Sequence, residues 1–317
     1  MIQTGKEQSM RKEEFYIKSR NGKDQLYCNH WLAEGQTKAV VQIAHGMIEH
    51  IRRYEAFARF LNEHQIAVIG HDHLGHGYSA KEAEDRGYFS DQDGSNLVIR
   101  DMYQITRYAR KRYPGIPIIL LGHSMGSFFA RKYMTVFGNR INGVILLGTG
   151  SYTFAEAAAG KALAAVIGKI KGKRFRSRLL YELMLGSMNR KIPDARTPHD
   201  WLSRDTKAVD EYEQDELCQF QFSAGACSDF FLILAELASK KYFDRIPKLL
   251  PVFLASGKED PVGDYGKGVE KVYKQFVSLG IRDLEIKLYD GMRHELLNEV
   301  GKEEVYDDIL SWLEKRF

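Results

Sequence analysis

The chain has 317 residues, of which 44% are hydrophobic, so it can bury the core of one large domain. Its 46 basic and 42 acidic residues leave a formal charge of +4, which is too small to indicate a nucleic-acid-binding protein. The three cysteines show no C-x-x-C spacing and predict neither a disulfide framework nor a zinc site; they are Cys28, Cys218 and Cys227. A polar amino-terminal stretch and the lack of an apolar run of about 18 residues lead us to expect a soluble, cytoplasmic protein.

The first predicted elements are two strands joined by a tight turn. Residues 15–18 and 26–32 have the composition of strands, and Asn21-Gly22 between them is a turn signal. After them, strands and helices alternate. Strands are predicted at 39–44, 66–69, 118–121, 143–147, 252–255 and 284–288, and helices at 54–63, 97–112 and 127–136. This alternation predicts a mostly parallel central sheet with helices on both faces.

One long segment, residues 151–222, interrupts the alternation. It is too long for a simple connection, and its composition is helical and poor in strand-forming residues. We therefore expect an inserted helical cap at 151–222, carried by a core that consists of residues 1–150 and 223–317.

The stretch Gly-His-Ser-Met-Gly at residues 122–126 lies between a predicted buried strand and a predicted helix. In this context G-x-S-x-G is the pattern of a nucleophile elbow, in which a serine occupies a strained turn and the glycines prevent clashes. The turn exposes the serine hydroxyl and aims the next backbone N–H at an oxyanion that forms beside it. The sequence therefore predicts Ser124 as the nucleophile and Met125 as one donor of an oxyanion hole.

A nucleophilic serine needs a base, and the base needs an acid that orients it. Two downstream loops offer these groups: GKEDPV at residues 257–262 and YDGMRHE at residues 289–295. Each loop follows a predicted strand, and the carboxyl ends of strands are where open α/β sheets gather their sites. His294 is the candidate base. Spacing leaves three candidate acids, which are Asp260, Glu259 and Asp264.

The loop after the predicted strand at 39–44 reads HGMIEHIRRY, and the Met47 backbone N–H is the natural second oxyanion donor. Together with DHLGHGYS, GHSMGS, GKEDPVGDYGKG and RHELLNE, this loop resembles the α/β-hydrolase family of monoacylglycerol lipases and bacterial lysophospholipases, within the serine aminopeptidase-like hydrolases. The resemblance covers nearly the whole chain outside the cap. It implies an α/β-hydrolase fold in which Ser124, Asp260 and His294 form a catalytic triad that needs no cofactor.

The same resemblance implies a small-molecule substrate, a lipid ester with a single acyl chain such as a monoacylglycerol or a lysophospholipid, cleaved through an acyl-enzyme. A general small-ester carboxylesterase or a peptidase of this fold would share the triad. A ligand-binding protein without activity would usually have lost one member of the triad. Haloalkane and epoxide chemistry is disfavoured, because those relatives have an aspartate at the position of Ser124.

Two further clusters each allow a structural and a functional interpretation. His71, His73 and His76 are similar to the H-x-H-x-D-H cluster of metallohydrolases, but Gly75 replaces the expected aspartate, so we expect no metal ion. A basic cluster beside the apolar stretch 162–170 predicts either a solvated helix face or a cap that contacts an anionic lipid surface or recognises an acidic head group. Its members are Lys169, Lys171, Lys173, Arg174, Arg176 and Arg178.

Overall fold

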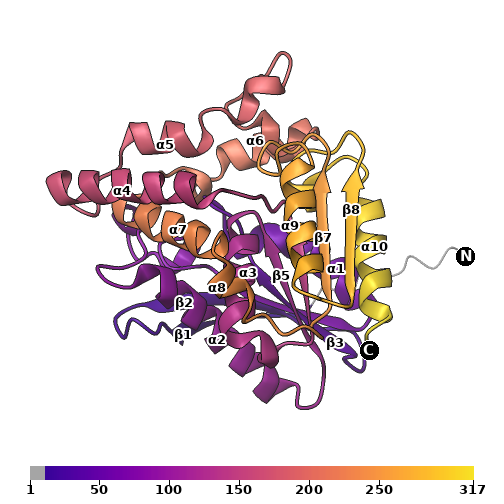
Figure 1. Ribbon diagram of the computed structural model, residues 1–317. Helices are drawn as coiled ribbons and strands as arrows, with labels where there is room; N and C mark the ends of the chain where they lie inside the picture. Colours follow the sequence, from indigo (N-terminus) through magenta and orange to yellow (C-terminus); the bar gives the residue numbers. More distant parts are fainter. Residues whose placement is uncertain (1–10) are drawn as a thin grey trace, which may run out of the picture.

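The structure is a computed structural model that describes residues 11–317; the polar stretch expected at residues 1–10 lies outside the described residues. Its centre is one eight-stranded sheet with the strand order β1-β2-β4-β3-β5-β6-β7-β8 (Figure 1). The strands are β1 (Lys12–Lys18), β2 (Gln25–Trp31), β3 (Ala39–Ala44), β4 (Ile66–His71), β5 (Ile118–His123), β6 (Gly143–Leu147), β7 (Val252–Gly257) and β8 (Leu284–Tyr289). β2 pairs antiparallel with β1 and β4, and the remaining pairs are parallel. The predicted α/β-hydrolase sheet, mostly parallel with an antiparallel entry, is confirmed.

The central strands are apolar on both faces because each face packs under its own layer of helices. Along β5, Ile118 and Leu120 belong to one hydrophobic core, whereas Ile119 and Leu121 belong to the other. This alternation explains why the strand appears in the sequence as an unbroken apolar run.

Helices cover both faces, as predicted. The helices α2 (Gly94–Arg112), α3 (Met125–Phe137) and α9 (Lys267–Ser278) contribute to the first core. The helices α1 (Glu55–Glu63) and α10 (Lys302–Glu314) contribute to the second. The described residues also form short 3-10 helices: η1 (Ile51–Tyr54), η2 (Gly77–Ser79), η3 (Ala83–Asp85), η4 (Gly138–Arg140), η5 (Met188–Lys191), η6 (Asp200–Leu202), η7 (Glu216–Cys218) and η8 (Leu296–Asn298).

A long helical connection joins β6 to β7, and its first part lies on the side toward which the arrowheads of β7 and β8 point (Figure 1). It contains α4 (Phe154–Lys171), α5 (Arg178–Leu185), α6 (Thr206–Gln214), α7 (Ala224–Leu237) and α8 (Lys240–Phe243). α4 packs along α7, and α7 also packs against α2 and α3 of the core. The expected cap thus corresponds to α4, α5 and α6, and its boundary at residue 222, just before α7, stays a prediction.

α4 begins at a capping box, which explains where this connection turns into a helix. The Thr153 hydroxyl accepts a hydrogen bond from the Glu156 backbone N–H, and the Glu156 carboxylate accepts one from the Thr153 backbone N–H. Although α4 is 18 residues long, no helix within residues 11–317 combines the length and the apolar character that crossing a membrane requires.

Candidate active site

Ser124 occupies a sharp turn between β5 and α3, as the elbow pattern predicts. Its backbone has φ 51° and ψ −122°, a combination that a residue with a side chain rarely adopts. The flanking glycines permit the turn: a Cβ on Gly122 would lie 2.3 Å from the carbonyl oxygen of Gly126, and one on Gly126 would lie 2.0 Å from that of Ala44. The strained turn therefore depends on both glycines and places Met125 at the first position of α3.

His294 and Asp260 meet at the carboxyl ends of β8 and β7. Asp260 Oδ1 lies 2.9 Å from His294 Nδ1 and accepts a hydrogen bond from the Val262 backbone N–H at 2.8 Å. The second oxygen, Oδ2, accepts one from Ser256 Oγ at 2.9 Å. Both members of the pair are buried, and His294 Nε2 has no hydrogen-bond partner among the described residues. The imidazole thus has one nitrogen held by a carboxylate and the other available.

Asp260 is the candidate acid that the structure brings to His294, whereas Glu259 and Asp264 have exposed side chains. Burial acts to raise the pKa of Asp260, but the hydrogen bonds from His294 and Ser256 outweigh it, and the pKa lies below its ordinary value. Asp260 is therefore an ionised carboxylate at neutral pH, suited to orienting an imidazole.

Ser124 and His294 line the same cavity, whose volume is about 440 Å³. Its walls also carry Gly46, Met47 and Met125, so the residues expected to form the oxyanion hole border the same space as the serine. The apolar lining comes from α3, α5 and α7 and includes Phe128, Leu183, Phe230, Phe231 and Leu234. Trp201 closes one side, with its ring centroid 5.0 Å from that of His294. The cavity combines an apolar wall with a few polar groups at one end, as ligand sites commonly do.

A buried carboxylate, Glu49, holds the loop that carries Met47 by hydrogen bonds. This side chain accepts hydrogen bonds from the Gly46 backbone N–H and from the Tyr54 hydroxyl, and its Oε1 lies 3.0 Å from His123 Nδ1. Although burial opposes a charge on His123, the bond to Glu49 raises the pKa of the imidazole above its ordinary value. Sequence reasoning did not single out Glu49 or His123, although both stand inside motifs that it quoted.

Two further contacts tie this loop to its surroundings. The Arg53 guanidinium donates hydrogen bonds to both carboxylate oxygens of Glu295, at 2.5 and 2.8 Å. Glu295 directly follows His294 in the chain. Arg53 Nη1 also donates to Glu49 Oε2 at 3.1 Å. The Tyr212 hydroxyl of α6 donates to the Ile48 backbone carbonyl at 3.0 Å. The loop is thereby connected both to the histidine loop and to the helical connection.

The three histidines of the sequence cluster, His71, His73 and His76, are buried, and their rings lie beside one another and beside His45. His45 and His73 have centroids 4.2 Å apart, and those of His71 and His73 are 4.8 Å apart. Both nitrogens of His71 and of His73 lack hydrogen-bond partners among the described residues. Burial lowers the pKa of His71 to about 3 and that of His76 to about 4, so these rings are neutral at pH 7.

The sheet and its helices define an α/β-hydrolase fold, in which Ser124 occupies the strained turn between β5 and α3. Residues 35–301 match the family described as serine aminopeptidase, S33, and the chain belongs to this family. The human monoglyceride lipase is 31% identical over 297 residues, which are 92% of this chain and 87% of that protein. The monoacylglycerol lipase of Mycolicibacterium smegmatis is 25% identical over 283 residues, 89% of this chain and 90% of that protein.

Among solved structures, a carboxyl esterase from Bacillus coagulans in complex with glycerol superposes with a TM-score of 0.90 at 28% identity. The alignment covers 97% of this chain and 99% of the esterase. The family, the relatives and this structural likeness identify the chain as a serine ester hydrolase, and at the level of the family they support the hydrolysis of lipid esters.

Proposed function

We propose that the protein hydrolyses lipid esters with a single acyl chain, such as monoacylglycerols or lysophospholipids, through a covalent acyl-enzyme. The observation that carries this proposal is a cavity in which an apolar wall leads to Ser124 and His294. One acyl chain fits along the apolar wall, with its ester group at the polar end.

In the proposed mechanism, His294 Nε2 takes the proton of Ser124 Oγ while the oxygen attacks the ester carbonyl. Asp260 holds the imidazole by its Nδ1–H and stabilises the positive charge that develops on the ring. The backbone N–H groups of Met47 and Met125 stabilise the tetrahedral oxyanion. His294 then protonates the leaving alcohol, and a water molecule that it activates releases the fatty acid from Ser124.

The relatives support this substrate class, since proteins named monoglyceride lipase and monoacylglycerol lipase align with nearly the whole chain. The Bacillus coagulans esterase forms a complex with glycerol, which is the alcohol that hydrolysis of a monoacylglycerol would release. A general small-ester carboxylesterase remains the second candidate, because that same esterase is the structural relative with a TM-score of 0.90.

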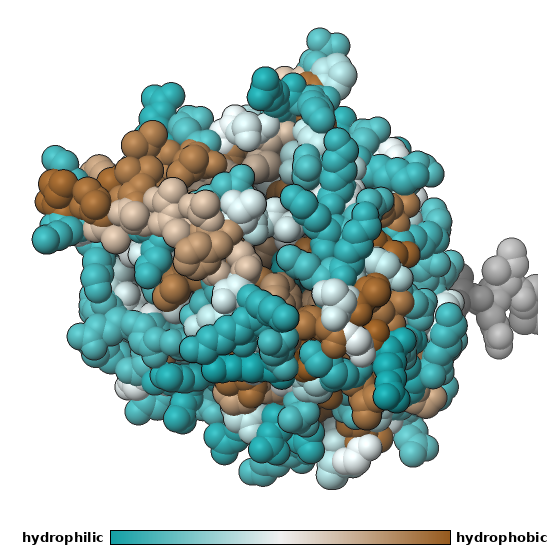
Figure 2. Space-filling view, in the orientation of Figure 1, coloured by the Kyte–Doolittle hydropathy of each residue, from teal (hydrophilic) through white to brown (hydrophobic). Residues whose placement is uncertain are grey.

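We further propose that the cap contacts lipid surfaces through an apolar area on α4 and α5. Figure 2 shows hydrophobic residues gathered over these helices. The exposed fractions of their apolar side chains are large: Val166 55%, Ile170 71%, Leu179 59% and Leu183 55%. Each helix contributes a pair four residues apart, so each pair lies on one helix face. Such an exposed patch favours contact with another apolar surface.

Four members of the basic cluster fall into two groups in the structure. Arg174 forms an ion pair with Asp85 at 2.8 Å, and Arg176 donates to the backbone carbonyls of Glu84 and Arg86. These two arginines therefore bind the cap to the loop around η3, which belongs to the core. Lys169 and Lys171 are exposed beside the apolar area, and we assign to them the attraction to an anionic surface.

A hydrolysis panel tests the proposed function. It comprises a short soluble ester, monoacylglycerols of increasing chain length, a lysophospholipid and an aminoacyl amide. Each methylene buried in the cavity contributes about 0.8 kcal/mol, so kcat/KM should rise roughly fourfold per methylene until the apolar wall ends. A preference for the short ester would favour the carboxylesterase, and a preference for the amide would favour a peptidase. Inactivity on every member would indicate a binding protein.

A further inference from the structure

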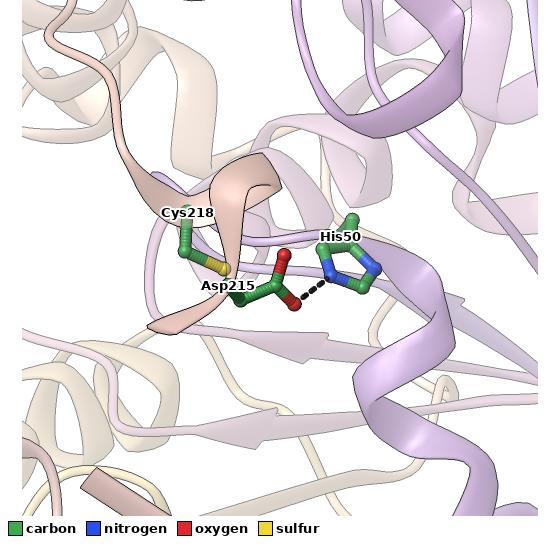
Figure 3. Close-up of side chains that lie close together, drawn as sticks. All are labelled: His50, Asp215 and Cys218. Atoms are coloured by element: carbon green, nitrogen blue, oxygen red, sulfur yellow. Dashed lines mark hydrogen bonds and ion pairs between the residues drawn. The ribbon is translucent and has the colours of Figure 1, made fainter. Parts of the chain in front are cut away.

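We propose that His50, Asp215 and Cys218 form a binding site for one divalent transition-metal ion of the zinc class. The three side chains meet from two distant segments. His50 ends the loop that carries Met47, whereas Asp215 directly precedes η7 of the helical connection and Cys218 is the last residue of η7 (Figure 3). The ligand atoms all lie within 4.8 Å of one another, and His50 Nε2 is 2.7 Å from Asp215 Oδ2.

The chemistry of the three donors selects the class of ion. An imidazole, a carboxylate and a thiolate are all zinc ligands, while calcium and magnesium prefer oxygen donors throughout. In a tetrahedral zinc site the ligand atoms stand roughly 3.3 to 3.8 Å apart, so shifts of about 1 Å would enclose an ion. The fourth position would be taken by water.

The burial of the group suits a bound ion with access from one side. His50 and Cys218 are 5% and 2% exposed, whereas the Asp215 side chain is 30% exposed. His50 and Asp215 border a surface groove, which offers an entry path and room for the fourth ligand. His50 Nδ1 has no hydrogen-bond partner among the described residues, so this nitrogen is free to carry the ring proton and leave Nε2 to the metal.

Charge balance also permits a cation here, although Arg53 stands nearby. The Arg53 guanidinium is compensated by Glu49 and Glu295, which it contacts at 3.1 and 2.5 Å. As the metal–sulfur bond forms, the Cys218 thiol releases its proton to solvent, and the proton of His50 moves from Nε2 to Nδ1. One thiolate and one carboxylate then neutralise the two charges of the ion.

Bound at this position, the ion would join the loop of Met47 to the helical connection. It would also bind the folded chain and not the unfolded one, so it should raise the melting temperature as its concentration increases.

Titration of the reduced, purified protein with Co²⁺ tests the site, because a cobalt–thiolate bond has a distinctive charge-transfer absorption. We expect one Co²⁺ per chain with this absorption, and its displacement by Zn²⁺. Cys218→Ser should abolish the absorption, and His50→Gln and Asp215→Asn should each weaken binding at least tenfold. Cys227→Ser, which alters another buried free cysteine, should retain it. So should His199→Gln, because His199 pairs with Glu213 at 2.8 Å without contributing to this group.

A second measurement needs no variant and covers the case in which Cys218→Ser fails to fold. Zn²⁺ should slow the alkylation of Cys218 in the wild-type protein, mapped by mass spectrometry, and leave the alkylation of Cys227 unchanged. The proposal is overturned if the folded wild type shows no cobalt–thiolate absorption, or if Cys218→Ser retains it. Equal loss in Cys227→Ser, or equal protection of both cysteines by Zn²⁺, would also overturn it.

Discussion

Arg53 and Glu295, 242 residues apart in the sequence, form a two-point ion pair that links the Met47 loop to the loop of His294. Both side chains are nearly buried, with exposed fractions of 11% and 5%. Because Glu295 follows the proposed catalytic base directly, this pair connects the segment of the proposed oxyanion donor to that of the base.

Replacing Arg53 by methionine should therefore damage both stability and turnover. The change leaves Glu49 and Glu295 buried without their cation, at a cost of about 3 to 5 kcal/mol in the free energy of unfolding. Denaturant unfolding and ester hydrolysis measure the two effects. The matched control is Arg316→Met, since Arg316 also bridges two carboxylates, Asp283 and Glu285, whose side chains are over 40% exposed. A smaller loss in Arg53→Met than in Arg316→Met would contradict the assigned role.

Ser124→Ala should remove nearly all ester hydrolysis, by a factor of roughly 10⁴ to 10⁶, because the nucleophile is lost while the turn is kept. Steady-state kinetics on a short soluble ester measure the loss, and the melting temperature checks the fold. Residual activity above about a few per cent in cleanly purified protein would refute Ser124 as the nucleophile.

Asp260→Asn should reduce kcat by about 10⁴, because the amide no longer fixes the tautomer of His294 or stabilises its charged form. Glu259→Gln and Asp264→Asn are matched controls on the same loop with exposed side chains, and each should change kcat less than about twofold. If either control were the more damaging, Asp260 would not be the acid.

The buried histidines should make the protein sensitive to acid. Burial lowers the pKa of His45, His71, His73 and His76 below the ordinary value of 6.5. As the pH falls below about 6.5, the unfolded chain therefore takes up protons that the folded chain does not. Each such histidine removes about 1.4 kcal/mol from the free energy of unfolding per pH unit.

Urea unfolding at a series of pH values between about 6.5 and 4.5 measures this slope. His71→Gln should reduce it by about 1.4 kcal/mol per pH unit, because one proton fewer distinguishes the two states. An unchanged slope in a folded His71→Gln protein would mean that this ring is charged in the native state.

The apolar area on the cap should matter only for aggregated substrates. Replacing Ile170 and Leu179 by serine should lower hydrolysis of emulsified long-chain monoacylglycerol several-fold, because less apolar surface enters the lipid. Hydrolysis of a short soluble ester should not change. Leu249→Ser is the matched control, since Leu249 is 73% exposed but lies outside the cap. Equal losses on both substrates would indicate a structural role for the two residues.

The sequence predicted those features that depend on neighbouring residues. The elbow at Ser124 follows from glycines two positions away on either side, and the strand at β5 follows from its own apolar run. The choice among three acids could not be made in this way. Glu259 and Asp260 are adjacent carboxylates, and only the turn of the folded loop decides which of them faces His294.

Contacts between distant segments were beyond the reach of sequence reasoning. The basic cluster is one example of such contacts. Arg174 and Arg176 bond the loop around η3, and these bonds depend on how α4 and α5 pack against the core. The meeting of His50 with Asp215 is another, since 165 residues separate them and neither belongs to a spaced metal motif.

The hydrogen bond from Tyr212 to the Ile48 carbonyl has a consequence for evolution and engineering. The helix α6 contributes Tyr212 to the wall of the proposed acyl cavity, and the same side chain bonds the backbone carbonyl of Ile48, next to Met47. With the proposed substrate, we therefore expect chain-length preference and catalytic rate to be coupled in this molecule. Substitutions in α6 selected to admit a different acyl chain will also shift the turnover of the chains already accepted, so the two properties should change together along any mutational path.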